Sequence, residues 1–137
     1  MTAFDTMGSI AVTRWRRHFS GLRDTRRRRG KRHRLVDVVL MSLLAMLCGC
    51  DDADDIAMWA EARCDMLTRW FSLEHGPPSQ DTILRVFSAL NPKTFSRAVS
   101  SWLGTIQLAA TRGHIAIDGK SLRGSLHRGG DASAVHL

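Results

Sequence analysis

The feature that most constrains this chain of 137 residues is one segment, Leu35 to Gly49, which is apolar on almost every face of a helix. A helix at a globular surface keeps a polar face, so a segment without one has to be enclosed by other elements. Its longest apolar run, Val38 to Cys50, is interrupted by Ser42 and is shorter than the ~20 residues that span a bilayer. We therefore predict a buried helix that ends at Gly49, and no transmembrane helix.

Amphipathic helical patterns follow this central segment. Apolar residues recur at helical spacing from Ile56 to Phe71, and again from Ile83 to Leu90. Ser79 is a suitable N-cap for the second pattern, and Pro92 suits the first turn of a further helix. We predict that residues 35 to 112 form an all-helical domain of four or five helices.

Positive charge is concentrated before this helical domain. The formal net charge is +7, and eleven basic residues lie between Arg14 and Arg34, where only Asp24 opposes them. Dense like charge resists compaction, and arginine favours bidentate contact with phosphate. We predict that residues 1 to 34 are an extended basic arm that contacts nucleic acid; the alternative is a solvated tail that keeps the chain soluble.

The pattern changes after Gly113. Residues 114 to 118 are a short β-branched run that ends on Asp118, and a polar, glycine-rich stretch follows. Because two strands cannot bury a core of their own, residues 113 to 137 are expected to be the start of a second domain. Asp118 could bind a divalent cation beside a phosphodiester, although the strand alone favours a simple turn cap.

Other candidate sites are weaker. One is an acidic cluster formed by Asp51, Asp52, Asp54 and Asp55. Helix capping and the helix dipole explain this cluster better than metal binding does. The cysteines lack zinc-site spacing and are expected to be buried small apolar residues, at Cys48, Cys50 and Cys64. So few cysteines, and no secretion signal at the start, favour a cytoplasmic protein. Gly119-Lys120-Ser121 lacks the earlier glycine of a phosphate-binding loop.

Several motifs resemble one family of proteins. Residues 115 to 125, IAIDGKSLRGS, resemble the first catalytic strand of DDE-type insertion-sequence transposases. Upstream segments resemble elements of the same family: DTRRRRGKRH at 24–33, IAMWAE at 56–61, PSQDT at 78–82, RVF at 85–87 and LNP at 90–92. More narrowly, the chain from about residue 21 onwards is similar to the ISAs-type family, which includes the H-repeat-associated proteins.

The resemblance implies a mainly α fold, in which an N-terminal helical domain precedes the first one or two strands of an incomplete ribonuclease-H-like α/β domain. In that family three acidic residues bind two Mg²⁺ ions, and water or a DNA 3′-hydroxyl attacks a phosphodiester. Asp118 matches one member of that triad, as a catalytic and metal-binding residue. The resemblance places the other two beyond Leu137, so we predict a truncated N-terminal part of a transposase that is inactive alone.

The same reasoning predicts the partners. DNA contacts are expected from basic side chains of the arm and of the segment after the strand: Arg26, Arg27, Arg28, Arg29, Lys31, Arg32, Lys120 and Arg123. The expected partners are DNA at the transposon ends and either a full-length transposase or a second copy, with no membrane. The alternatives are a non-enzymatic DNA-binding module that inhibits a full-length transposase, and a poorly folded remnant.

Overall fold

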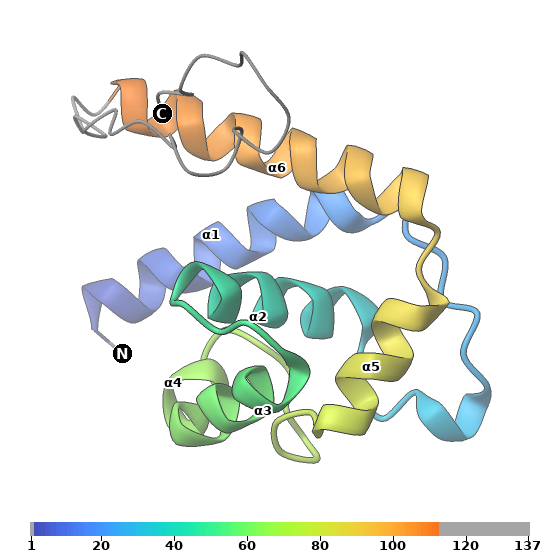
Figure 1. Cartoon of the computed structure of the whole chain (residues 1–137). Coiled ribbons are helices and arrows are strands. Elements are labelled where there is room, and N and C mark those ends of the chain that lie inside the picture. Colours follow the sequence, from blue (N-terminus) through green and yellow to red (C-terminus); the bar gives the residue numbers. More distant parts are fainter. Residues whose placement is uncertain (1, 113–137) are drawn as a thin grey trace, which may run out of the picture. The chain divides into compact units, whose positions relative to one another are not determined.

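The computed structural model describes residues 2 to 112 (Figure 1). Every regular element in this range is helical, which confirms the mainly α prediction. The expected strands of a ribonuclease-H-like domain are not shown, because residues 113 to 137 lie outside the described range. Asp118, Lys120 and Arg123 lie there too. No described helix is long and apolar enough to cross a membrane.

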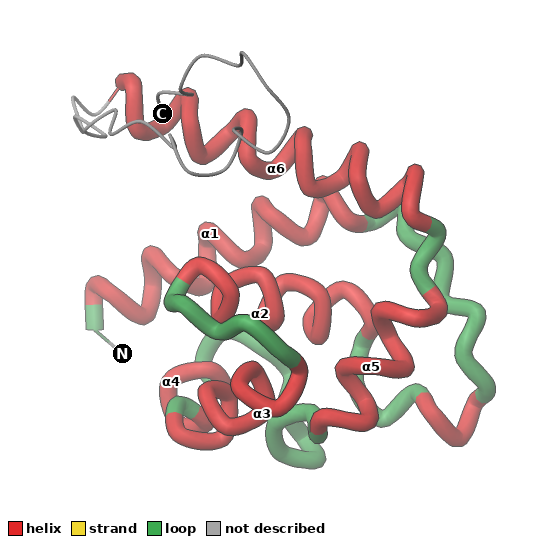
Figure 2. Tube along the Cα trace, in the orientation of Figure 1, coloured by secondary structure: helices red, strands yellow, loops and turns green. Residues whose placement is uncertain are grey.

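The helices are joined by short loops, except around η1 and before α5 (Figure 2). In chain order they are α1 (Ala3–Phe19), the 3₁₀ helix η1 (Arg28–Gly30), α2 (Leu35–Leu47), α3 (Ala53–Ala62), α4 (Cys64–Leu67), α5 (Gln80–Ala89) and α6 (Pro92–Arg112). Ser79 caps α5 as predicted, since its hydroxyl accepts a hydrogen bond from the Thr82 amide at 3.3 Å.

Helix α2 forms the centre of the core, as its apolar sequence predicts. Nine of its 13 residues are buried, and it packs against α1, α3 and α5 (Figure 1). The buried Ser42 hydroxyl donates to the Val38 carbonyl at 2.8 Å, so it leaves no unpaired donor inside the core. The helix ends just before Gly49, whose φ of 99° is a conformation that glycine adopts without steric strain.

The prediction of an extended arm over residues 1 to 34 is wrong for its first half. Residues 3 to 19 form α1, which begins with a capping box between Thr2 and Asp5 and packs against α2. Val12 and Phe19 are fully buried on its inner side. Val12 and Phe19 lie two helical turns apart, a local signal that the arginines between them interrupt.

Helix α1 also lies close to Trp70. A Cβ atom at position 8 would overlap the Trp70 indole, so the approach depends on Gly8 having no side chain. Phe4, one turn earlier, lies against the same indole, with ring centroids 5.5 Å apart. Residues 1 to 101 form one compact unit, the first unit, to which α1 belongs together with α2 to α5.

Candidate nucleic-acid interface

The basic segment between α1 and α2 forms a loop that its own side chains close. Arg26 donates to both carboxylate oxygens of Asp24, each at 2.9 Å, and to the His33 carbonyl at 2.8 Å. Its side chain is only 6% exposed. A guanidinium offers several donors in one plane, so Arg26 can join both ends of a loop that spans residues 24 to 33. We call these ten residues the basic loop.

A second contact attaches the basic loop to the rest of the fold. His33 is buried, and its Nε2 donates to the Gly76 carbonyl at 2.8 Å. Gly76, with φ of 76°, lies in the connection that leads to α5. The basic loop is therefore held at its start and at its end, which corrects the expectation that this segment is extended.

Asp24 stays charged at neutral pH. Hydrogen bonding to the Arg26 side chain lowers the pKa of the Asp24 carboxyl below its usual range, against the opposing effect of burial. The Arg26 amide also donates to Asp24, at 3.1 Å. The ionised carboxylate is therefore the acceptor that keeps Arg26 folded against the loop.

The other cations of the basic loop face solvent. Arg27, Arg28, Arg29, Lys31 and Arg32 are all exposed. Lys31 makes one long hydrogen bond, from Nζ to the Asp24 carbonyl at 3.4 Å. Within the described residues the four arginines of this set make no ion pair and no side-chain hydrogen bond. The structure thus separates the predicted contact residues into one that closes the loop, Arg26, and five that are available to a ligand.

Two arginines elsewhere in the first unit, Arg16 and Arg69, serve the fold. Arg16 donates to the buried Asp37 carboxylate at 2.9 Å and to the Trp70 carbonyl at 3.2 Å. Arg69 donates to both oxygens of Asp5 at 2.9 Å. These two cations are paired with buried carboxylates of the same chain, so the arginine count of the sequence overstates the charge that is free to bind a polyanion.

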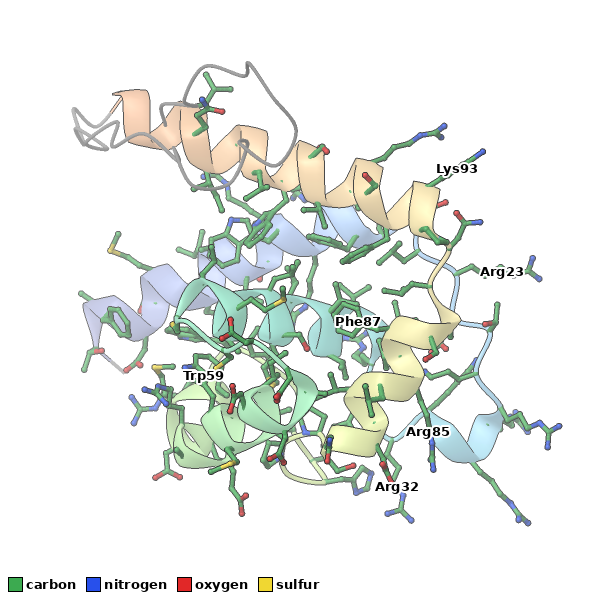
Figure 3. The ribbon with its side chains drawn as sticks, viewed as in Figure 1. Arg23, Arg32, Trp59, Arg85, Phe87 and Lys93 are labelled. Atoms are coloured by element: carbon green, nitrogen blue, oxygen red, sulfur yellow. The ribbon has the colours of Figure 1, made fainter. Side chains whose placement is uncertain are left out.

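Further exposed cations lie outside the basic loop: Arg23 belongs to the basic arm that the sequence predicts, whereas Arg85 and Lys93 were not predicted. In Figure 3 Lys93 and Arg23 lie at the right of the view, and Arg85 and Arg32 lie below them. All of them are exposed. Arg85 could have been found from the sequence, because it falls between the apolar positions Ile83 and Val86 of an amphipathic helix.

The acidic cluster acts as the sequence predicts. Asp52 caps α3 by accepting from the Asp55 amide at 2.9 Å. Among the described residues no group of three or more His, Cys, Asp or Glu side chains could hold a metal ion. The expectation that the cysteines are buried is wrong: Cys50 and Cys64 are only partly buried, and Cys48 is exposed because it follows the last turn of α2, beyond the enclosed part of that helix.

Known proteins resemble the chain in sequence. The DDE_Tnp_1-associated family matches residues 16 to 103. The "H repeat-associated putative transposase YhhI" of Escherichia coli (strain K12) is 32% identical over 120 residues, which are 88% of this chain and 32% of that protein. The "Inactive transposase YbfQ" of the same strain is 36% identical over 56 residues, 41% of this chain and 67% of that protein.

A protein from Xanthobacter autotrophicus, the "Uncharacterized protein in dhlA 3'region", is 35% identical over 108 residues, 78% of this chain and 36% of that protein. The chain thus spans about a third of the length of several curated relatives. No solved structure matches it.

Proposed function

Because this chain belongs to the DDE_Tnp_1-associated family, we propose that it is the DNA-binding N-terminal part of an insertion-sequence transposase. The observation that carries the DNA-binding part is the basic loop, which displays five exposed cations on a backbone held by Arg26 and His33. A loop that is already ordered loses less conformational freedom on binding than a flexible tail would. Its arginines match the geometry of phosphate oxygens.

Salt dependence follows from this proposal. Each phosphate that a cation neutralises releases a counterion, so the logarithm of affinity falls with the logarithm of salt by about 0.9 per contact on a duplex. Contacts to phosphate position a protein without reading sequence. Preference for the ends of the mobile element would therefore need base contacts in addition to those of the basic loop.

The first test is a binding titration of the purified chain at two salt concentrations, with the element's ends and random duplex in competition. We expect the triple variant Arg27→Ala, Arg28→Ala, Arg29→Ala to weaken binding to both duplexes and to flatten the salt slope by about two to three units. The control removes three exposed arginines elsewhere: Arg14→Ala, Arg17→Ala, Arg63→Ala. If both triple variants lost the same affinity for DNA, the net charge of the chain, and not the basic loop, would determine binding.

We also propose that Asp118 supplies one carboxylate to an Mg²⁺ site in a longer protein, where Lys120 and Arg123 lie beside the DNA backbone. The support is the resemblance of residues 115 to 125 to a catalytic strand, since these residues lie outside the described range. A single carboxylate cannot hold the two metal ions that in-line phosphoryl chemistry requires.

A second candidate function is a non-enzymatic module that occupies transposon ends and inhibits a full-length transposase. It is favoured because the basic loop and the core around α2 lie in one compact unit. We expect the purified chain with Mg²⁺ or Mn²⁺ to leave end DNA intact, and to lower the yield of a transposition assay that contains a full-length relative. Nicking that disappears in Asp118→Ala would contradict this candidate.

A further inference from the structure

Two exposed cations outside the basic loop come from two other elements. Arg85 lies in the second half of α5, and Lys93 lies in the first turn of α6. Both side chains are exposed, and neither makes an ion pair or a side-chain hydrogen bond within the described residues. In Figure 3 Lys93 lies at the upper right of the view, Arg85 and Arg32 lie in its lower part, and Trp59 lies at the left.

We propose that Arg85 and Lys93 extend the basic loop into one surface that binds the phosphate backbone of duplex DNA, an inference that rests on the function proposed above. The proposed partner is double-stranded DNA. The proposed surface extends from the basic loop across α5 to the start of α6. Three features support this surface: the anchoring of these elements, the lack of largely exposed Phe or Trp rings on it within the described residues, and the local charge balance.

Helix α5 is fixed relative to the basic loop. The His33 side chain, at the end of the loop, donates to the Gly76 carbonyl three residues before the N-cap of α5. The helix buries Ile83 and Val86 and packs against α2 and α3. Arg85 lies between those two buried positions and points away from the core, so it is presented by a rigid element next to the loop.

The corner between α5 and α6 fixes Lys93 in turn. The Asn91 side chain accepts from the Lys93 amide at 3.0 Å and from the Thr94 amide at 3.2 Å, which starts α6 at a defined point. Phe87 and Phe95 meet edge to face, with ring centroids 5.7 Å apart. The two cations are therefore held on helices whose junction is packed, and not on a free hinge.

The aromatic side chains argue against a single-stranded partner. Proteins that bind single strands stack the bases on exposed aromatic rings. Among the Phe and Trp side chains described, Phe4 is the one that is largely exposed, and it lies against Trp70 at the start of α1. Phe87 packs on Phe95, and Trp59 is covered by the Arg63 guanidinium at 5.2 Å. In the described residues the basic face thus offers charge without a largely exposed Phe or Trp ring, which suits a duplex backbone.

The acidic side chains near this face do not cancel its exposed cations, so its net charge is positive. Asp24 is neutralised by Arg26. Asp81 is exposed and lies one helical turn before Arg85, with no ion pair between the two in the described structure. Asp81 should therefore repel a phosphate that Arg85 attracts, and its removal should act in the opposite direction to the removal of Arg85.

The test compares single variants of the whole 137-residue chain by titration with a duplex and with the corresponding single strand. We expect Arg85→Gln and Lys93→Gln each to weaken duplex binding by up to about eightfold at about 0.1 M salt, and to lower the salt slope by about 0.9. Asp81→Asn should strengthen duplex binding. The matched control is Arg63→Gln, which removes one exposed arginine beside Trp59 and should change affinity little. Far-ultraviolet circular dichroism confirms that each variant is folded.

The outcomes separate this inference from the function on which it rests. If the basic-loop triple variant binds like the unmodified chain, the proposed DNA-binding function fails. If the triple variant is weakened while Arg85→Gln and Lys93→Gln behave like Arg63→Gln, the surface is confined to the loop and the inference is overturned. Tighter binding to the single strand than to the duplex would overturn the assignment of the partner class.

Discussion

At the scale of single residues, the cations of this protein differ in what they are free to do. Arg26 is buried and bonded to Asp24 and His33, whereas its neighbour Arg27 is exposed. The sequence alone does not distinguish these two arginines, because they are adjacent in one run of basic residues. The difference arises because Arg26 has a carboxylate two residues away, in a turn that directs both side chains together.

Asp24 provides a sharp test of this distinction. We expect Asp24→Asn to weaken DNA binding about fivefold, equivalent to about 1 kcal/mol of lost loop order, because an amide cannot accept all the hydrogen bonds that the carboxylate accepts from Arg26. Simple electrostatics predicts the reverse, since the variant removes a negative charge. The control is Asp65→Asn, which removes an exposed carboxylate of α4. If Asp24→Asn bound DNA more strongly, the order of the basic loop would not contribute to binding, and the loop would act only through its charge.

At the scale of helices, short-range patterns set most of the boundaries. Ser79 before α5 and Pro92 at the start of α6 are local signals, and the structure places both helices where those signals predict. Helix α1 was not predicted, because its apolar stripe is interrupted by cations whose role depends on distant partners. Arg16, for example, meets Asp37 and the Trp70 carbonyl.

The contact between α1 and Trp70 can be tested at Gly8. In a helix, exchange of glycine for alanine normally stabilises by up to about 1 kcal/mol. At position 8 the new Cβ would overlap the Trp70 indole, so we expect Gly8→Ala to lower the free energy of unfolding by about 1–3 kcal/mol.

The matched control for Gly8→Ala is Gly104→Ala in α6, where a Cβ meets nothing within 4 Å. Urea unfolding followed by circular dichroism measures both variants. If Gly8→Ala were as stable as Gly104→Ala, the close packing of α1 on Trp70 would be refuted.

At the scale of the whole molecule, ion pairs join parts of the chain that lie far apart in sequence. Arg69 bonds Asp5 across 64 positions, and Asp5 also closes the capping box of α1. The Thr2 backbone amide, followed by the Arg69 side chain, lowers the pKa of Asp5 from 3.8 to about 2. Ionisation of the Asp5 carboxyl therefore makes the stability of the first unit depend on pH.

The sign of that pH dependence follows from the lowered pKa. A carboxyl that is more acidic in the folded state stabilises the fold above its unfolded pKa, and this contribution is lost as pH falls through the folded value. We expect the difference in unfolding free energy between the unmodified chain and Asp5→Asn to be constant from neutral pH to about 4, and to shrink between about 4 and 2. Urea titrations at several pH values measure it. If this difference in unfolding free energy did not change with pH, ionisation of Asp5 would not be a cause of the pH dependence of stability.

The sequence by itself determined the helical class, the central position of α2 and the family. These features depend on residue spacing within a few turns, or on motifs that are contiguous along the chain. The tertiary structure decided which arginines are neutralised and which are exposed, where α1 packs, and that the basic loop lies beside α5. These depend on pairs such as His33 with Gly76, 43 positions apart, whose meeting no local pattern encodes. A charge acts on its neighbours in space, so the nucleic-acid surface could be located only once the fold had placed those neighbours.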